Sequence, residues 1–104
     1  MKIYVVTTIG DIIDNGKDKF PDITHKRSVG FYTNLEDAKR CVENNNLDIN
    51  ESGYYKFAAI EEVKEGLYGS CDPHTIFYKW ETDRYIETER PACTECYVGF
   101  SEIG

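Results

Sequence analysis

Four residues of the types that bind zinc stand in two short pairs in the C-terminal half of this chain. Two residues separate Cys71 from His74, two separate Cys93 from Cys96, and 18 residues lie between the pairs. Three thiolates and one imidazole complete a tetrahedral shell that leaves no position for a water molecule, which is typical of a structural zinc site. We therefore predict one structural zinc ion. Its ligands would be Cys71, His74, Cys93 and Cys96.

The segment between the two pairs has the pattern of a β-hairpin. Thr75 to Glu81 (TIFYKWE) is rich in aromatic and β-branched residues, Thr82-Asp83 supplies a short turn, and Arg84 to Thr88 follows as a second strand. A hairpin brings its two flanking segments to the same end, which is how a zinc ribbon places its ligand pairs. We expect a zinc-ribbon-like part over about residues 66–104, in which the metal fixes the hairpin.

The cysteines allow two other interpretations. Cys93 and Cys96 could form a redox couple, although such couples usually open a helix in a βαβ unit, which is not predicted here. The four residues could also be unrelated to one another. Cys41 is outside the tetrad and is expected to fill the inner face of a helix as a small apolar residue.

The N-terminal half predicts two strands and one helix. Lys2 to Thr8 (KIYVVTT) is a buried strand, residues 9–24 are a long polar connection, and Lys26 to Tyr32 is a second strand. Thr33 and Glu36 fit a capping box that starts a helix of about 12 residues.

One face of this predicted helix is apolar. Leu35, Ala38 and Val42 fall at helical spacing, and the run of asparagines from Asn44 to Asn46 ends the helix because Asn tolerates a left-handed cap. After it, Tyr54 to Val63 predicts another strand, and Tyr97 to Phe100 a last short one.

These elements predict an α+β fold. One helix would pack on a mainly antiparallel sheet in the order ββαβββ, with the last short segment as a further strand. A chain of 104 residues is the size of one domain, so we expect residues 1–104 to form a single α+β domain.

The charge of the chain narrows the classes of partner. The net charge is −7; residues 1–52 hold nine acids and seven bases, and residues 53–104 hold ten acids and five bases. Direct nucleic-acid binding needs a basic face, so we expect a protein partner rather than nucleic acid. An acidic protein can bind a basic partner, but a net charge of this size is also usual for a small soluble domain and by itself favours solubility alone. No segment has the length of a membrane span and the start of the chain has no signal-peptide layout, so we expect a cytoplasmic protein.

The sequence contains no recognisable active site, so we expect a protein that is not an enzyme. It has no catalytic triad pattern, no glycine-rich phosphate loop and no His-Glu-x-x-His helix. Instead, acids and aromatics alternate through the second half and could form a surface that imitates a nucleic-acid strand. The acids are Glu61, Glu62, Glu65, Glu81, Asp83, Glu87, Glu89 and Glu95, and the aromatics are Tyr68, Tyr78, Trp80 and Tyr85.

Two resemblances bear on function. The patterns KIYVVTT, RSVGFYTNLEDAKRCVENN, YKW and YIETERP are similar to those of small uncharacterised proteins of Firmicutes and their phages. In size, acidity, abundance of Ile, Asn, Lys and Tyr, and the zinc-like tetrad, the chain also resembles the small type II-A anti-CRISPR proteins, the zinc-binding type especially.

The second resemblance implies a non-enzymatic phage-type inhibitor. Such a protein would bind Cas9 inside the host bacterial cell and block its engagement of target DNA, with the tetrad as a structural zinc site. The alternative is a cellular zinc-ribbon-like module that binds another protein. A sponge for a nucleotide signal is a further alternative, but it would need a basic pocket that the sequence barely offers.

Overall fold

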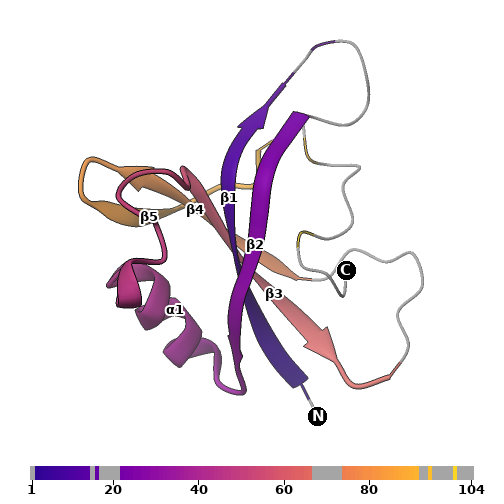
Figure 1. Cartoon of the computed structure of the whole chain (residues 1–104). Coiled ribbons are helices and arrows are strands. Elements are labelled where there is room, and N and C mark those ends of the chain that lie inside the picture. The colour runs from indigo at the N-terminus through magenta and orange to yellow at the C-terminus, as the bar shows by residue number, and fades with distance from the viewer. Residues whose placement is uncertain are drawn as a thin grey trace.

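The computed structural model describes residues 2–14, 16, 22–66, 74–91, 94 and 100 of the chain, and every structural finding concerns these residues. They form five strands, one α-helix and one 3-10 turn (Figure 1). The elements are β1 (Lys2–Ile13), β2 (Asp22–Tyr32), α1 (Leu35–Glu43), η1 (Asn46–Asp48), β3 (Phe57–Lys64), β4 (Thr75–Glu81) and β5 (Arg84–Thr88).

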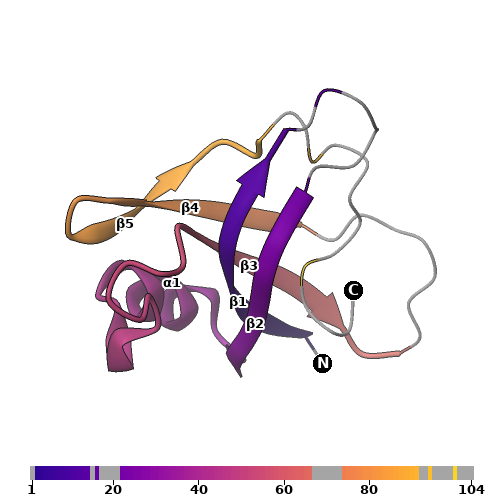
Figure 2. The ribbon, with the colours of Figure 1, turned by 45° about the horizontal axis from the view of Figure 1, so that its top comes forward.

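The five strands make one antiparallel sheet in the order β2-β1-β3-β4-β5. Because β2 and β3 both run antiparallel to β1, the chain from β2 through α1 to β3 crosses over β1. That crossover lays α1 against one face of the sheet, below the β4–β5 hairpin in Figures 1 and 2. The predicted α+β class and the ββαβββ order are confirmed for the described residues.

The first hairpin is longer than the sequence predicts. β1 continues to Ile13 rather than ending at Thr8, and β2 begins at Asp22 rather than at Lys26, so Ile13 pairs with Asp22. Prediction fails here because the polar stretch lacks an alternating pattern. Hydrogen bonds between the two strands keep these residues extended. Such pairing depends on tertiary structure and cannot be predicted from local composition.

The backbones of β1 and β2 approach each other closely at Gly10, and their pairing register shifts by one residue between Val6 and Thr7. A methyl group placed on Gly10 would lie 2.8 Å from the carbonyl oxygen of Thr24, so only glycine fits there without a shift. Val6 pairs with Gly30 whereas Thr7 pairs with Ser28, which leaves one extra residue on β2. This is a β-bulge, a feature that bends and twists an edge strand.

The cap of α1 corrects one prediction. Asn34, not Thr33, is the N-cap: its backbone is extended, and its side-chain oxygen accepts a 3.2 Å hydrogen bond from the N–H of Asp37. Asn and Thr both serve as N-caps, and capping-box spacing alone does not fix which of two adjacent cap formers takes the position. The helix itself spans nine residues, shorter than predicted.

The main hydrophobic core lies between α1 and the sheet, as the predicted apolar face of the helix requires. Ala38 and Val42 of the helix are fully buried there, and Cys41 is buried beside them. The buried members of this core are Val6, Ala38, Val42, Ile49, Ala58, Ile60, Tyr78 and Tyr85.

A second, smaller core covers the other face of the sheet. It is formed by Ile9, Ala59, Phe77 and Phe100, and the rings of Phe77 and Phe100 meet edge to face at 5.2 Å. Glu61 of β3 is completely buried on this face, where its carboxylate accepts a 3.0 Å hydrogen bond from the N–H of Phe100.

The remaining strands agree with the sequence in part. β4 and β5 have the predicted bounds, because the alternating pattern and the short turn are local signals. β3 begins at Phe57 rather than Tyr54, because the Tyr55 carbonyl is engaged by side chains instead of a neighbouring strand. The predicted strand at residues 97–100 lies outside the described residues except for Phe100.

Candidate binding site

A groove runs between the C-terminal end of α1 and strand β5. Its volume is about 320 Å³. Residues from both elements line it, although more than 35 positions of sequence separate them. The lining residues are Glu43, Asn44, Arg84, Tyr85, Ile86 and Glu87, and we call this feature the α1–β5 groove.

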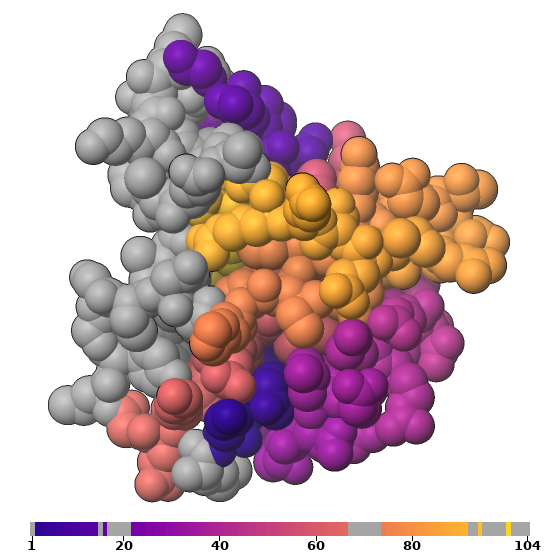
Figure 3. All heavy atoms as spheres, turned by 180° about the vertical axis from the view of Figure 1, so that it is seen from behind, coloured from indigo at the N-terminus to yellow at the C-terminus, as the bar shows by residue number. Residues whose placement is uncertain are grey.

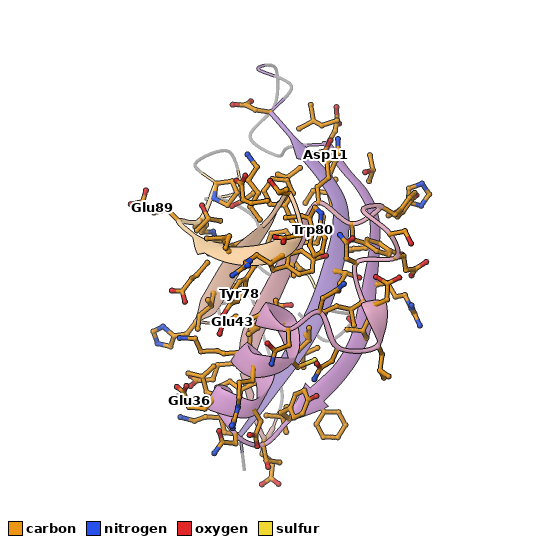
Figure 4. The ribbon with its side chains drawn as sticks, turned by 90° about the vertical axis from the view of Figure 1, so that its left-hand side faces the viewer. Asp11, Glu36, Glu43, Tyr78, Trp80 and Glu89 are labelled. Atoms are coloured by element: carbon orange, nitrogen blue, oxygen red, sulfur yellow. The ribbon has the colours of Figure 1, made fainter. Side chains whose placement is uncertain are left out.

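Two polar contacts hold the walls of the groove in place. The hydroxyl of Tyr78 on β4 donates a 3.0 Å hydrogen bond to Oε2 of Glu43 on α1, and Figure 4 shows these two side chains side by side. Lys39 of α1 lies with its Nζ 3.5 Å from Oε1 of Glu87 on β5. These two contacts tie the helix to the hairpin through the lining residues Glu43 and Glu87.

Glu43 breaks a common rule of helix electrostatics. The C-terminal end of a helix carries partial negative charge, so cations are favoured in the last turn and anions are disfavoured. Here the last helical residue is a glutamate, and it lines the groove. Its carboxylate adds to the negative potential of the helix end. The groove is consequently a place where a cation would be stabilised.

The charges around Tyr78 also make the electrostatic potential here negative. Burial raises the pKa of the Tyr78 hydroxyl far above its usual value, and the hydrogen bond to Glu43 raises that pKa further. The negative charges of Glu43, Glu87 and Glu36 add to the shift. Three carboxylates from α1 and β5 thus act on the hydroxyl of Tyr78, which is bonded to the lining residue Glu43.

The outer edge of the groove has apolar and hydrogen-bonding capacity as well. β5 is the last strand of the sheet among the described residues, so its outer backbone edge is unpaired there. Ile86 lies in the middle of this strand and is 45% exposed. The space-filling view in Figure 3 shows the hairpin, in orange, exposed on the surface of the molecule.

A buried network fixes the floor of the groove. The hydroxyl of Tyr85 donates a 2.7 Å hydrogen bond to the carbonyl oxygen of Tyr55, and Asn50 Nδ2 donates to the same oxygen over 2.7 Å. Oδ1 of Asn50 accepts from the N–H of Gly53. Burial is the main cause that raises the pKa of Tyr85, to about 12. These polar groups are engaged in holding the fold.

A second cavity, of about 400 Å³, lies between β2 and the segment after α1. It is mainly apolar, and Leu47 on its rim is fully exposed with a left-handed backbone (φ 56°). Cys41 and Tyr32 are among its lining residues, and a hydrogen bond to Cys41 is the main cause that raises the pKa of the Tyr32 hydroxyl. Phe31, at 61% exposure, lies on the same strand.

Three of the residues predicted to form a surface of acids and aromatics are not on the surface. Glu61, Tyr78 and Tyr85 are buried rather than displayed, because alternate residues of a strand face opposite sides and both sides of this sheet are covered. Glu62 points to the other side from Glu61 and pairs with Lys2 at 3.2 Å.

Of the predicted zinc ligands, only His74 is among the described residues. It is exposed, directly precedes β4, and its carbonyl oxygen accepts a 2.9 Å hydrogen bond from the N–H of Glu62. Cys71, Cys93 and Cys96 lie outside the described residues. Within the described part, no three His, Cys, Asp or Glu residues are grouped as a metal site would need.

Comparison with protein-family models, with curated proteins and with solved structures finds no match for this chain. The described part of the chain also contains no helix that is long and apolar enough to cross a membrane. The candidate site therefore has to be argued from its own geometry.

Sequence reasoning missed Glu43, Asn44 and Asn50 as residues of interest. One signal for Glu43 was present, because an acid in the last turn of a predicted helix runs against the helix dipole. No sequence signal was available for Asn50. Its role depends on the approach of Tyr85, which is 35 residues away in the chain.

Proposed function

We propose that this chain is a non-enzymatic protein-binding module, and that its specific role is that of a phage-type inhibitor which binds Cas9 and blocks target-DNA engagement. The observation that carries the binding role is the α1–β5 groove. It is lined by carboxylates from two elements, and beside it lie the exposed side chain of Ile86 and the outer edge of the last strand among the described residues.

The electrostatics support a basic partner. The chain has a net charge of −7, and Glu43 and Glu87 line the groove at the negative end of a helix. A protein that binds nucleic acid presents basic surface to it, and an acidic protein can compete for such a surface. Cas9, the partner that the family resemblance implies, is of this kind.

A structural zinc ion remains part of the proposal, and two findings support it. In the β4–β5 hairpin Phe77 pairs with Thr88, so the chain segments that carry the two ligand pairs leave the hairpin at the same end. Thr94, inside the second pair, is buried and donates from its N–H and its hydroxyl to the carbonyl oxygen of Pro91 (2.9 and 2.7 Å). A tight turn of this kind is usual for paired metal ligands.

The test of the specific role uses purified chain with Cas9 loaded with guide RNA. We expect a complex on size exclusion and loss of DNA cleavage when the chain is in excess. Full cleavage at excess protein and no complex would remove the Cas9 role. Affinity purification from the source cells would then identify the partner of the alternative, a cellular zinc-ribbon-like interaction module.

A further inference from the structure

The two edges of the sheet are built differently. β2 has a bulge within its pairing to β1, a residue with positive φ (His25, 40°) and two adjacent cations, Lys26 and Arg27. Bulges and charged residues of this kind prevent an edge strand from pairing with another chain. β5 pairs with β4 in continuous register and has no residue with positive φ. β5 carries charged residues as well, Arg84 and Glu87, but of the two edges of the described sheet its regular pairing makes it the better suited to accept another strand.

We propose that the β5 edge and the α1–β5 groove bind an extended, basic segment of a protein partner, which adds to the sheet beside β5. This inference rests on the proposed binding function and names its mode and the chemistry of the partner. An edge strand beside a helix is a known arrangement for peptide recognition: backbone hydrogen bonds give affinity, and alternate side chains enter the groove.

Strand alternation predicts the sequence pattern of the bound segment. Tyr85 is buried in the core that α1 forms with the sheet, and Glu87 pairs with Lys39 of α1, so both face the helix. Ile86, between them on β5, faces the other side. Side chains of the added strand that face α1 would meet Glu43 and Glu87. Those that face away would lie beside Ile86. The segment should therefore alternate basic and apolar residues.

The cations near the groove do not cancel this preference. Arg84 lies beside Asp83, with its Nε 3.3 Å from Oδ1, and Lys39 contacts Glu87 through one oxygen. A carboxylate offers two oxygens and about four acceptor sites, so Glu43 and Glu87 retain capacity for an incoming guanidinium beside their present partners. Arginine fits this role because its planar fork can bind two acceptors at once.

The probe is a fluorescent Arg-Val-Arg-Val-Arg peptide, whose length matches the five residues of β5. We expect saturable binding in fluorescence anisotropy, with amide shift changes in NMR at β5 and at Glu43–Asn44. Two matched peptides serve as controls. Glu-Val-Glu-Val-Glu reverses the charge, and an N-methylated Arg-Val-Arg-Val-Arg keeps the side chains but cannot form the backbone hydrogen bonds.

The matched variants are Glu43→Gln/Glu87→Gln, which neutralises the groove, and Glu51→Gln/Glu65→Gln, which removes the same charge elsewhere. The groove variant should weaken the peptide about three- to tenfold, as expected for two partly exposed charge pairs, and the control variant should change binding less than twofold. Circular dichroism checks that both variants are folded.

Three results with the peptides or with the chain alone would overturn the inference. The first is no binding of the basic peptide at about 1 mM. The second is an N-methylated peptide that binds as tightly as the unmodified peptide, or a groove variant that binds the basic peptide as tightly as the unchanged chain does. The third is a concentration-dependent dimer that Ile86→Lys abolishes, which would assign the edge to a second copy of the chain. If Cas9 or another identified partner binds the groove variant as tightly as the unchanged chain, the inference fails while the binding function stands.

Discussion

The hydroxyl of Tyr78 donates a 3.0 Å hydrogen bond to Oε2 of Glu43 and thereby joins the middle of the sheet to the end of the only α-helix among the described residues. The donor is buried and the acceptor lies at the rim of the α1–β5 groove. The same hydrogen bond therefore stabilises the fold and positions a residue of the candidate site. Mutation of either partner separates these two roles.

Tyr78→Phe should lower the free energy of unfolding by about 1 kcal/mol, because it removes the donor and leaves the ring in the core. Glu43→Gln should leave stability within about 0.5 kcal/mol of the unchanged chain, because the amide oxygen still accepts and an unfavourable charge at the helix end is removed. Urea unfolding of both variants measures this. A larger loss for Glu43→Gln than for Tyr78→Phe would contradict the assignment.

Asn50 should be one of the polar residues on which the fold depends most. Asn50→Ala leaves the N–H of Gly53 without its acceptor and takes one donor from the carbonyl of Tyr55, so we expect a loss of about 2 to 4 kcal/mol. Asn46→Ala, four residues earlier and exposed, should cost less than about 0.5 kcal/mol. Thermal and urea unfolding provide the comparison. Similar losses in the two variants would show that the buried network contributes little.

Alkaline pH should weaken the fold through Tyr85. Its pKa is raised to about 12 in the folded chain, whereas an unfolded tyrosine titrates near 10. A group whose folded pKa is raised contributes stability that is present below the unfolded pKa and is lost as pH rises through the folded one. By pH 11 the loss from Tyr85 should reach about 1.4 kcal/mol.

The measurement for Tyr85 is the free energy of unfolding at intervals from pH 8 to pH 11. Tyr78, whose pKa is also raised, adds to the decline, so Tyr85→Phe should reduce the slope without abolishing it. A slope that is the same in Tyr85→Phe as in the unchanged chain would refute the prediction.

Gly10→Ala should destabilise the first hairpin by about 1 to 3 kcal/mol, because its methyl group would lie 2.8 Å from the backbone oxygen of Thr24. Gly30→Ala tests the same substitution on the paired strand, where no atom lies within 4 Å of the added methyl. Gly30→Ala should be neutral or slightly stabilising, since it restricts the unfolded chain. Equal effects of the two substitutions would argue against the close approach of β1 and β2.

The parts of the fold that sequence predicted are those whose signals are local. The alternation of Thr75 to Glu81 and the turn after it gave β4 and β5 their bounds, and the apolar spacing of Ala38 and Val42 gave the buried face of α1. The ends of β1 and β2 were not predictable in this way, because their polar residues are held by pairing across the hairpin.

The candidate site was less predictable than the fold. Glu43 and Glu87 line the same groove only because the crossover between β2 and β3 lays α1 against one face of the sheet, beside the last hairpin, which is a long-range arrangement. Burial also changed the expected surface: Glu61 is enclosed by the second core, although a glutamate in a strand usually faces solvent. Period-2 alternation separates the two faces of a strand but does not tell which of them is covered.

The zinc prediction requires a measurement on the whole chain. We expect about one zinc per chain by elemental analysis, and a melting temperature that falls when a chelator removes the metal. Cys93→Ser/Cys96→Ser should lose the zinc and increase hydrogen exchange over residues 70–104. β1 should be less affected because it is paired on both sides within the sheet, and α1 because its buried residues lie in the helix-side core. Cys41→Ala, which alters the buried cysteine outside the tetrad, should keep the zinc.

A metal-free chain with an unchanged melting temperature would exclude the structural zinc site, and a disulfide between Cys93 and Cys96 in that chain would favour the redox alternative.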